Sequence, residues 1–334
     1  MQTNPSLFPL NGEFPLFLAP MAELTHSGFR ALLHTWGGCS VYATEMISAP
    51  GLLSKGPYER FYLDFSPDPS RTIVQLVGYD TDSLVQAAGI LAEYPILGVD
   101  INMGCAAPEI RKRGGGAGWL LRGEEAVRLV GEVRRVLPPH LSLSVKIRIP
   151  ESLPLEEFIA FLQGLMGQGL SFITVHPKGL KEKHDRPARW DLIPPLLEEI
   201  PIPVVGNGNI TSFDVYRKRR EEIPGLAGIM IGRKAVQAPW FFAYLRSRDR
   251  GEREPFTVNL EEAARSFLEL LSRHQPPEFH LSRARRFFRY YTRNLFFGHT
   301  LLSAILKADS LTEIERLLSA YFERHPEEIL HEEE

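Results

Sequence analysis

Residues 203–233, PVVGNGNITSFDVYRKRREEIPGLAGIMIGR, contain two short apolar segments separated by one helical segment. The apolar segments, Pro203–Asn207 and Gly228–Ile231, are continuous rather than alternating, which is typical of strands buried on both faces. The segment between them, Ser212–Glu221, is polar and long enough for a helix. A buried strand, a helix and a second buried strand together predict a unit of parallel sheet covered by helices.

The same unit recurs along the chain towards the N-terminus. The predicted strands are Phe14–Ala19, Val41–Met46, Thr72–Val77, Gly98–Met103, Ser142–Ile149, Phe172–His176, Pro203–Asn207 and Gly228–Ile231. The predicted helices are His26–Trp36, Ser83–Glu93, Glu124–Leu137, Pro154–Gln168, Arg189–Ile200 and Ser212–Glu221. Eight such units within roughly 240 residues favour an α/β fold, the closed (β/α)8 TIM barrel. An open doubly wound sheet is the alternative.

The strand pattern stops after Trp240. Residues 255–334 have apolar side chains at helical spacing, as in AARSFLELLSRH, and are predicted to form a small all-helical C-terminal domain. We therefore assign residues 1–242 to the barrel and residues 243–254 to a linker, because the charged run RSRDRGEREP begins at Arg246 and ends at Pro255. The final EEE is expected to be a frayed, solvated terminus.

The composition is that of a globular protein: of 334 residues, 44% are hydrophobic and 24% are charged, which argues against a disordered chain. Two cysteines, Cys39 and Cys105, are too few for a disulfide framework and suggest a reducing compartment. The N-terminus has no leader pattern, and no apolar run approaches the roughly 18 residues of a membrane span. These features predict a soluble, cytoplasmic protein without membrane contact.

The net charge of -3 at first argues against a nucleic-acid partner, yet the cations are unevenly placed. Between Phe279 and Ala308 there are six Lys or Arg residues and no acidic residue, with aromatic residues interleaved. This pattern predicts a surface that tracks phosphates. The alternative is a solvated helix face beside a stripe of core residues.

Polar residues mark the ends of the predicted strands, where the active site of such a barrel lies. In chain order they are Pro20 and Met21, Glu45, Gln75, Asn102 to Cys105, Lys146 and Arg148, His176, Asn207 and Gly208, and Gly232 and Arg233. Such a ring suits a ligand with carbonyl and imide groups and a phosphate, and it contains no metal-ligand pattern. Taken singly, Gln75, Asn102 and His176 could be structural, and the glycines could belong to ordinary turns.

Three features at this mouth have distinct chemistry. Lys146 alternates with apolar residues in SVKIRI, so its ammonium should meet an anionic partner or ligand. Cys105 follows a strand end within a glycine-containing loop, where a protonated thiol could act as a general acid; an inert, packed cysteine is the alternative. Residues Arg113–Gly118, RGGGAG, match no phosphate-binding loop and are predicted to form a mobile loop over the mouth.

Several motifs together resemble the tRNA-dihydrouridine synthases. They are APMAELTHSGFRALLHTWGG, TEMISA, VQLVG, DINMGCAAPEIRKRGGGAGWLL, SVKIRI, TVH, ARWDLI, VVGNGNI and MIGRKA, spread from about Pro15 to Phe242. The resemblance implies an FMN-binding barrel and a helical domain that holds tRNA. It also implies that NADPH reduces the FMN, after which flavin N5 delivers hydride to uridine C6 while Cys105 donates a proton to C5.

The resemblance also implies roles for individual residues. The FMN set would be Pro20, Met21, Gln75, Lys146, His176, Asn207, Gly208, Gly232 and Arg233, with Lys146 at the flavin N1–O2 edge and the glycines and Arg233 on the phosphate. The resemblance places Asn102 at the target base and Lys178 on the substrate, whereas Arg283, Arg285 and Arg286 are expected to contact the RNA because they belong to the basic stretch. The target uridine would be extruded from the folded tRNA into the pocket.

The sequence departs from the family's pattern at three places. Cys105 is followed by Ala106 and Ala107 instead of proline, His176 is followed by Pro177 and Lys178, and an arginine-rich stretch replaces the usual motifs of the helical domain. Two other functions therefore stay open: a flavin barrel that acts on a free pyrimidine or another small molecule, and an RNA-binding relative that has lost the chemistry. We expect a monomer with no protein partner.

Overall fold

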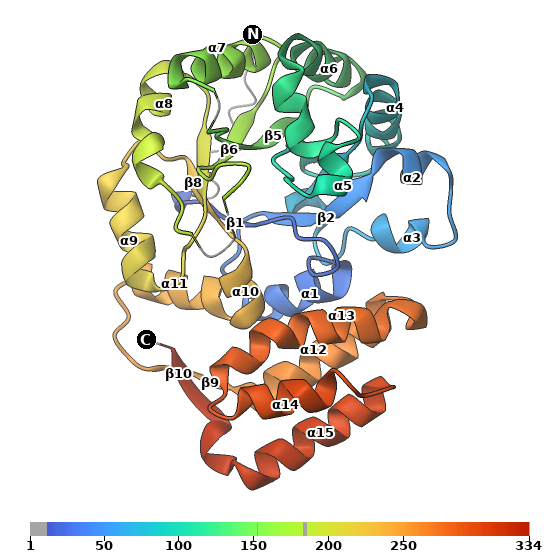
Figure 1. Cartoon of the computed structure of the whole chain (residues 1–334). Helices are drawn as coiled ribbons and strands as arrows, with labels where there is room; N and C mark the ends of the chain where they lie inside the picture. Colours follow the sequence, from blue (N-terminus) through green and yellow to red (C-terminus); the bar gives the residue numbers. More distant parts are fainter. Residues whose placement is uncertain (1–11, 152, 183–185, 334) are drawn as a thin grey trace.

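The computed structural model describes residues 12–151, 153–182 and 186–333. Its main sheet has eight parallel strands in the order β1-β8-β7-β6-β5-β4-β3-β2. The strands are β1 (Leu16–Leu18), β2 (Tyr42–Ser48), β3 (Thr72–Val77), β4 (Gly98–Met103), β5 (Ser142–Arg148), β6 (Phe172–His176), β7 (Val204–Asn207) and β8 (Gly228–Ile231). The backbone N–H of Leu18 donates to Val41 O at 2.9 Å, which joins β1 to the segment leading into β2. The sheet is therefore the predicted closed barrel (Figure 1).

Helices follow the strands and cover the outside of the barrel. They are α1 (Ser27–Trp36), α2 (Ala49–Leu53), α3 (Glu59–Tyr62), α4 (Thr81–Leu91), α5 (Pro108–Arg111), α6 (Gly123–Val136), α7 (Leu155–Met166), α8 (Pro194–Glu199), α9 (Phe213–Glu222), α10 (Arg233–Gln237) and α11 (Phe241–Asp249). Short 3-10 turns lie at η2 (Pro69–Arg71), η3 (Gly116–Leu121) and η4 (Trp190–Leu192). Several starts follow from local chemistry: the Asp80 carboxylate, for example, accepts from the N–H of Ser83 at 2.7 Å and caps α4.

The barrel interior below the mouth is filled by apolar side chains. Phe17, Ile73, Phe172, Val205 and Met230 are buried there, and the rings of Phe17 and Phe172 lie 5.8 Å apart. This packing closes the lower part of the barrel, so a ligand can enter only from the carboxyl ends of the strands.

The C-terminal region is helical, as predicted, with α12 (Leu260–His274), α13 (Pro277–Tyr291), α14 (Gly298–Ile305) and α15 (Leu311–Arg324), and the 3-10 turns η5 (Thr292–Asn294) and η6 (Pro326–Glu328). Figure 1 shows these helices beside α1 and α10 of the barrel. Phe29 of α1 packs on Phe287 of α13 with ring centroids 6.2 Å apart, and Phe287 stacks on Phe267 of α12 at 3.6 Å. One continuous apolar core thus joins the two regions.

The structure corrects the linker prediction for residues 243–254. Helix α11 occupies residues 241–249, and its Tyr244, Leu245 and Arg246 side chains are buried. The Arg246 guanidinium donates to Gly38 O at 3.2 Å and to Ser40 Oγ at 2.8 Å, so its charge is held by protein oxygens instead of water. A charged run can be buried where such acceptors are available, which composition alone does not reveal.

The end of the chain is also more ordered than the sequence suggested. β10 (Leu330–Glu333) pairs antiparallel with β9 (Phe256–Asn259), a two-stranded sheet that the sequence analysis did not predict. The Glu333 carboxylate is buried, forms an ion pair with Lys234 Nζ at 2.5 Å and accepts from Trp240 Nε1 at 2.7 Å. The prediction of a solvated EEE end is therefore wrong for Glu333, because this carboxylate binds the barrel.

Some predictions concern residues outside the described part of the chain. Residues 1–11, where the sequence shows no leader pattern, lie there, and so does Glu334. Within the described ranges, no helix is both long and apolar enough to span a membrane.

Candidate active site

A cavity of about 430 Å³ opens at the carboxyl ends of the barrel strands. Its wall contains all nine residues predicted to hold the cofactor: Pro20, Met21, Gln75, Lys146, His176, Asn207, Gly208, Gly232 and Arg233. Asn102 and Cys105 line it as well. The structure thus brings together eleven predicted residues from seven strands and their loops, in a cavity of the size that cofactor sites usually have, roughly 300–1,000 Å³.

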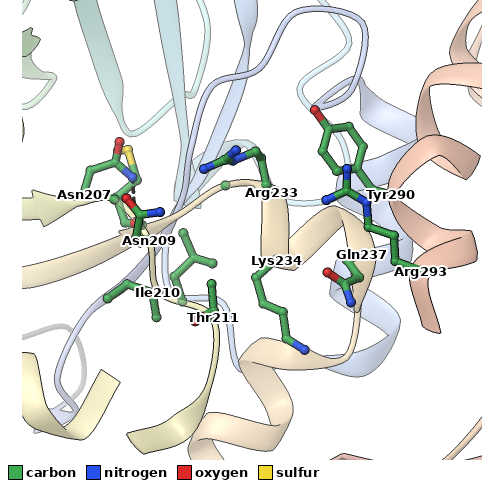
Figure 2. Close-up of a pocket in the computed structure, with 13 residues that line it drawn as sticks. Asn207, Asn209, Ile210, Thr211, Arg233, Lys234, Gln237, Tyr290 and Arg293 are labelled. Carbon is green, nitrogen blue, oxygen red and sulfur yellow. Dashed lines mark hydrogen bonds between the residues drawn. The ribbon is translucent and has the colours of Figure 1, made fainter. Parts of the chain in front are cut away.

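A second cavity, of about 470 Å³, adjoins the first beneath the loops that follow β7 and β8. Both cavities share Asn207, Gly208, Asn209, Gly232, Arg233 and Tyr290, so they form one continuous hollow. In the view of Figure 2, Arg233 lies between Asn207 on the barrel side and Tyr290 with Arg293 on the side of the helical domain. The site is therefore closed on one side by α13 and η5, far along the sequence from the barrel loops.

The loop after β7 requires glycine at position 208. Its backbone φ is +129°, and a Cβ there would lie 2.8 Å from Ala188 Cβ and 3.0 Å from the His176 ring. A Cβ at Gly232 would meet Met21 Sδ at 3.3 Å. Both glycines therefore leave room that a side chain would fill, and backbone N–H groups in such loops are suited to an anion.

The hollow is strongly electropositive. Lys146, Arg148, Arg233, Lys234 and Arg293 line it, whereas none of the described residues in its wall is an aspartate or glutamate. Burial, and after it the surrounding cations with Lys146 first among them, together lower the pKa of His176 to about 2, so this imidazole is neutral at physiological pH. The site should therefore bind a ligand with negative charge.

Lys146 meets the predicted need for an anionic partner only in part. Burial lowers the pKa of its ammonium to about 8, and the attraction of Asp100 opposes that shift. Among the described residues Lys146 forms no ion pair within 4.0 Å. An anionic group bound in the cavity would complete its environment.

Asn102 holds the loop that contains Cys105. Its Oδ1 accepts from the backbone N–H of Gly104 at 3.1 Å and of Cys105 at 2.8 Å. Its Nδ2 donates to Gln75 Oε1 at 2.8 Å and to Met46 Sδ at 3.0 Å. Asn102 is therefore part of the support of the loop, and a base could receive a hydrogen bond from it most easily in place of Met46, because a thioether is a weak acceptor.

The three arginines predicted to contact RNA differ in how far they are exposed to solvent. Arg283 is 2% exposed and its Nη1 lies 2.7 Å from Glu45 Oε2, so it forms a buried ion pair between α13 and the barrel instead of an RNA-binding surface. Arg285 is partly buried and donates to Ala308 O at 2.6 Å within the helical domain. Arg286 is exposed and pairs with Glu23 at 2.6 Å across the barrel mouth.

Two further predictions need correction. Lys178 is only 2% exposed and is not among the residues that line the cavity, so this side chain cannot meet a substrate in the present arrangement. The glycine-rich segment at 113–118 is not a loose loop: Gly116 and Gly118 are buried in η3, and the N–H of Ala117 donates to Cys105 O at 2.9 Å. The segment supports the Cys105 loop from behind.

Sequence reasoning left out several residues of the wall. Met46 and Tyr290 line the cavity but were not predicted there. Arg148, which the sequence analysis placed at a strand end without giving it a role, lines the cavity as well, as does Asn209 in the loop after β7. Tyr290 comes from α13, and a strand-end rule has no means of finding it.

These features define a TIM-barrel protein with a cationic ligand site at the carboxyl ends of its strands. The sequence model of the family described as "Dihydrouridine synthase (Dus)" matches residues 17–299, so the chain belongs to the dihydrouridine synthase family. The protein is 29% identical over 316 residues to the "tRNA-dihydrouridine(16) synthase" of Cupriavidus necator, covering 91% of this chain and 96% of that one. It is 31% identical over 261 residues to the "Probable tRNA-dihydrouridine synthase" of Aquifex aeolicus, covering 77% and 79%.

Solved structures agree with the fold. Histamine dehydrogenase from Rhizobium sp. 4-9 superposes with a TM-score of 0.51 at 14% identity, over 77% of this chain and 49% of that one. At this identity the likeness concerns the barrel architecture alone.

Proposed function

We propose that this protein reduces the C5–C6 double bond of a uridine in tRNA to 5,6-dihydrouridine, with FMN as cofactor and NADPH as reductant. The observation that supports this most is the composition of the hollow at the barrel mouth. It combines five cations, five amide side chains and the Cys105 thiol with no carboxylate among its described residues, in a chain of the dihydrouridine synthase family. Because the proposed substrate is tRNA, we also propose that the protein works in the cytoplasm. Its proposed working form is a monomer.

The residues of the hollow fit FMN in charge and shape. Gly208, Gly232 and Arg233 would hold the phosphate, because both glycines leave space at the backbone and Arg233 is exposed beside them. Lys146 would lie near the ring system, where its incompletely compensated ammonium favours an anionic group. Gln75 and Asn207 offer amides for the carbonyl and imide atoms. The chemistry that FMN supplies when bound is the transfer of reducing equivalents from NADPH to C6 of the uracil.

Cys105 would provide the proton that the product needs at C5. The thiol is half-buried in the cavity wall, and its backbone N–H is held by Asn102 at 2.8 Å. Asn102 and η3 hold the backbone of Cys105 from two sides, and its side chain lines the cavity. A positioned acid of this kind usually contributes roughly 10²–10⁴-fold to the rate.

The test compares purified wild type with Cys105→Ala and, as a matched control, Cys39→Ala. Cys39 is 1% exposed and lies outside the cavity, so its loss should leave the reaction unchanged. We expect FMN to copurify and NADPH to reduce it in all three proteins, while dihydrouridine in tRNA, measured by nucleoside mass spectrometry, falls roughly 10²–10⁴-fold in Cys105→Ala only. Equal turnover by all three would remove Cys105 from the acid role.

The same assay decides whether the substrate is RNA. A protein that reduces free uridine or uracil as fast as tRNA would instead be an oxidoreductase of small pyrimidines. A protein that binds tRNA but leaves its uridines unchanged, with NADPH present, would contradict the proposed reaction.

A further inference from the structure

A row of side-chain hydrogen bonds crosses the barrel interior and ends on the backbone of Cys105. Ser144 Oγ donates to Asp100 Oδ1 at 2.6 Å, and Gln75 Nε2 donates to Asp100 Oδ2 at 2.7 Å. Gln75 Oε1 in turn accepts from Asn102, which accepts from the N–H of Cys105. The four side chains are 0% to 6% exposed, so water cannot replace any of these bonds.

The direction of donation is fixed at both ends of this row. A backbone N–H can only donate, so Asn102 must turn its oxygen towards Cys105 and its nitrogen towards Gln75. An ionised carboxylate can only accept, so Gln75 must turn its nitrogen towards Asp100 and its oxygen towards Asn102. A half-turn of either amide would place two donors or two acceptors face to face in the protein interior, and such unsatisfied buried groups are unfavourable.

We propose that Asp100 is a positioning residue whose carboxylate sets the orientation of the Gln75 and Asn102 amides and thereby holds the Cys105 loop. Asp100 does not line the cavity, so its hydrogen-bonded connection to the Cys105 loop runs through the two amides. Burial raises the pKa of Asp100 to about 6, while the bonds from Ser144 and Gln75 oppose the rise, so the carboxylate is mostly ionised at pH 7.5. The inference rests on the proposed function in one respect, that the orientation of Cys105 matters for catalysis.

Thiol alkylation reports the Cys105 loop without any need for turnover. The chain has two cysteines, and Cys39 is 1% exposed, so slow labelling of the folded protein by iodoacetamide reports Cys105. Asp100→Leu removes the acceptor and frees both amides to turn; we expect Cys105 to be alkylated roughly ten-fold faster, as when one buried hydrogen bond is lost. Asp100→Asn should stay within about two-fold of wild type, because its oxygen can accept from Gln75 while its nitrogen donates to the Ser144 hydroxyl.

A polarity swap gives the sharper test. Asn102→Asp alone places a second carboxylate at the other end of the row, so Gln75 cannot satisfy both, and alkylation should again rise roughly ten-fold. Adding Asp100→Asn allows the Gln75 amide to make a half-turn, so that its two bonds reverse direction while those of Ser144 and of the Cys105 N–H stay as they are, and the row is consistent once more. We expect the double variant to return to within about three-fold of wild type.

Two results would overturn the proposal. One is a double variant that labels as fast as Asn102→Asp alone; the other is Asp100→Asn labelling as fast as Asp100→Leu, which would mean that charge matters and direction does not. The swap conserves shape and total charge, so it is the variant expected to fold even where Asp100→Leu does not. Failure of the proposed function is a separate result: wild type would then make no dihydrouridine, whatever the labelling rates.

Discussion

Replacing Arg283 by alanine should destabilise the protein strongly and leave the salt dependence of tRNA binding unchanged. Arg283 and Glu45 are 2% and 6% exposed, and their charged atoms lie 2.7 Å apart. The other oxygen of Glu45 accepts from the N–H of Glu23 at 2.6 Å. The pair therefore joins α13 to the middle of β2 in a place that is shielded from water.

The magnitude follows from what the substitution leaves behind. Without Arg283, Glu45 retains one backbone donor and only the attraction of Arg30, with which it forms no ion pair within 4.0 Å among the described residues; removing one partner of a buried ion pair usually costs about 3–5 kcal/mol. The arginine also packs on the Phe279 ring, 5.0 Å from its centroid, and that contact is lost as well. Glu45→Gln combined with Arg283→Met removes both charges, keeps an acceptor for Glu23 and fills the space, so it should recover most of the loss.

The assay is urea unfolding of wild type, of Arg283→Ala and of the double variant with Glu45→Gln and Arg283→Met. tRNA binding by the same proteins is measured at several salt concentrations. Arg286→Ala is the matched control: its pair with Glu23 is about half exposed on each side, so it should change stability by less than about 1 kcal/mol. The reasoning fails if Arg283→Ala unfolds like wild type while the salt slope of tRNA binding falls by about 0.7–0.9, the value for one lost phosphate contact.

Three further outcomes are expected. His176→Gln should make the apoprotein more resistant to acid. In the unfolded chain this histidine binds a proton below about pH 6.5, whereas in the folded protein its pKa is about 2. In urea unfolding, the stability of the variant relative to wild type should therefore rise by about 1.4 kcal/mol for each pH unit below 6.5. Glu333→Gln should lower the free energy of unfolding by about 2–3 kcal/mol at pH 7, because His331, Lys234 and Trp240 overcome the effect of burial and lower the pKa of this carboxylate to about 2. In thermal melts the difference from wild type should shrink as the pH falls from 4.5 towards 2. A difference at pH 3 equal to that at pH 7 would contradict this. Replacing the exposed Arg289 and Arg293 together by glutamine should reduce the salt slope of tRNA binding by about 1.4–1.8, and an unchanged slope in filter binding would exclude them from the RNA surface.

The barrel could be predicted from sequence because its signals are local and repeated. Each strand is a short apolar run, each is followed by a helical stretch, and in a barrel all strand ends meet at one mouth. That single geometric rule brings Met21, Gln75, Lys146, His176 and Arg233 together, although up to 212 positions separate them along the chain. No pair contact had to be known in advance.

Within the basic stretch, the prediction for Arg283 was wrong for a reason that helical geometry explains. Arg283 precedes the buried Phe287 by four residues and the buried Tyr291 by eight, so it lies on the apolar face of α13. Arg286, Arg289 and Arg293 follow the other face and remain exposed. Counting cations over a window mixes the two faces, whereas the spacing to the aromatic residues could have separated them. What no spacing reveals is the partner, Glu45, which lies 238 positions earlier.

The cations of the active site, unlike Arg283, have few carboxylates beside them. Asp100 is the only carboxylate described as acting on Lys146, and both of its oxygens already accept hydrogen bonds, from Ser144 and Gln75. Glu151 and Glu182 attract Arg148, but the described wall of the hollow holds no aspartate or glutamate beside Lys146 and Arg233. Because burying uncompensated charge is costly, this mouth favours a ligand that brings negative charge; under the proposed function, a phosphate-bearing cofactor and then an RNA strand would each supply it.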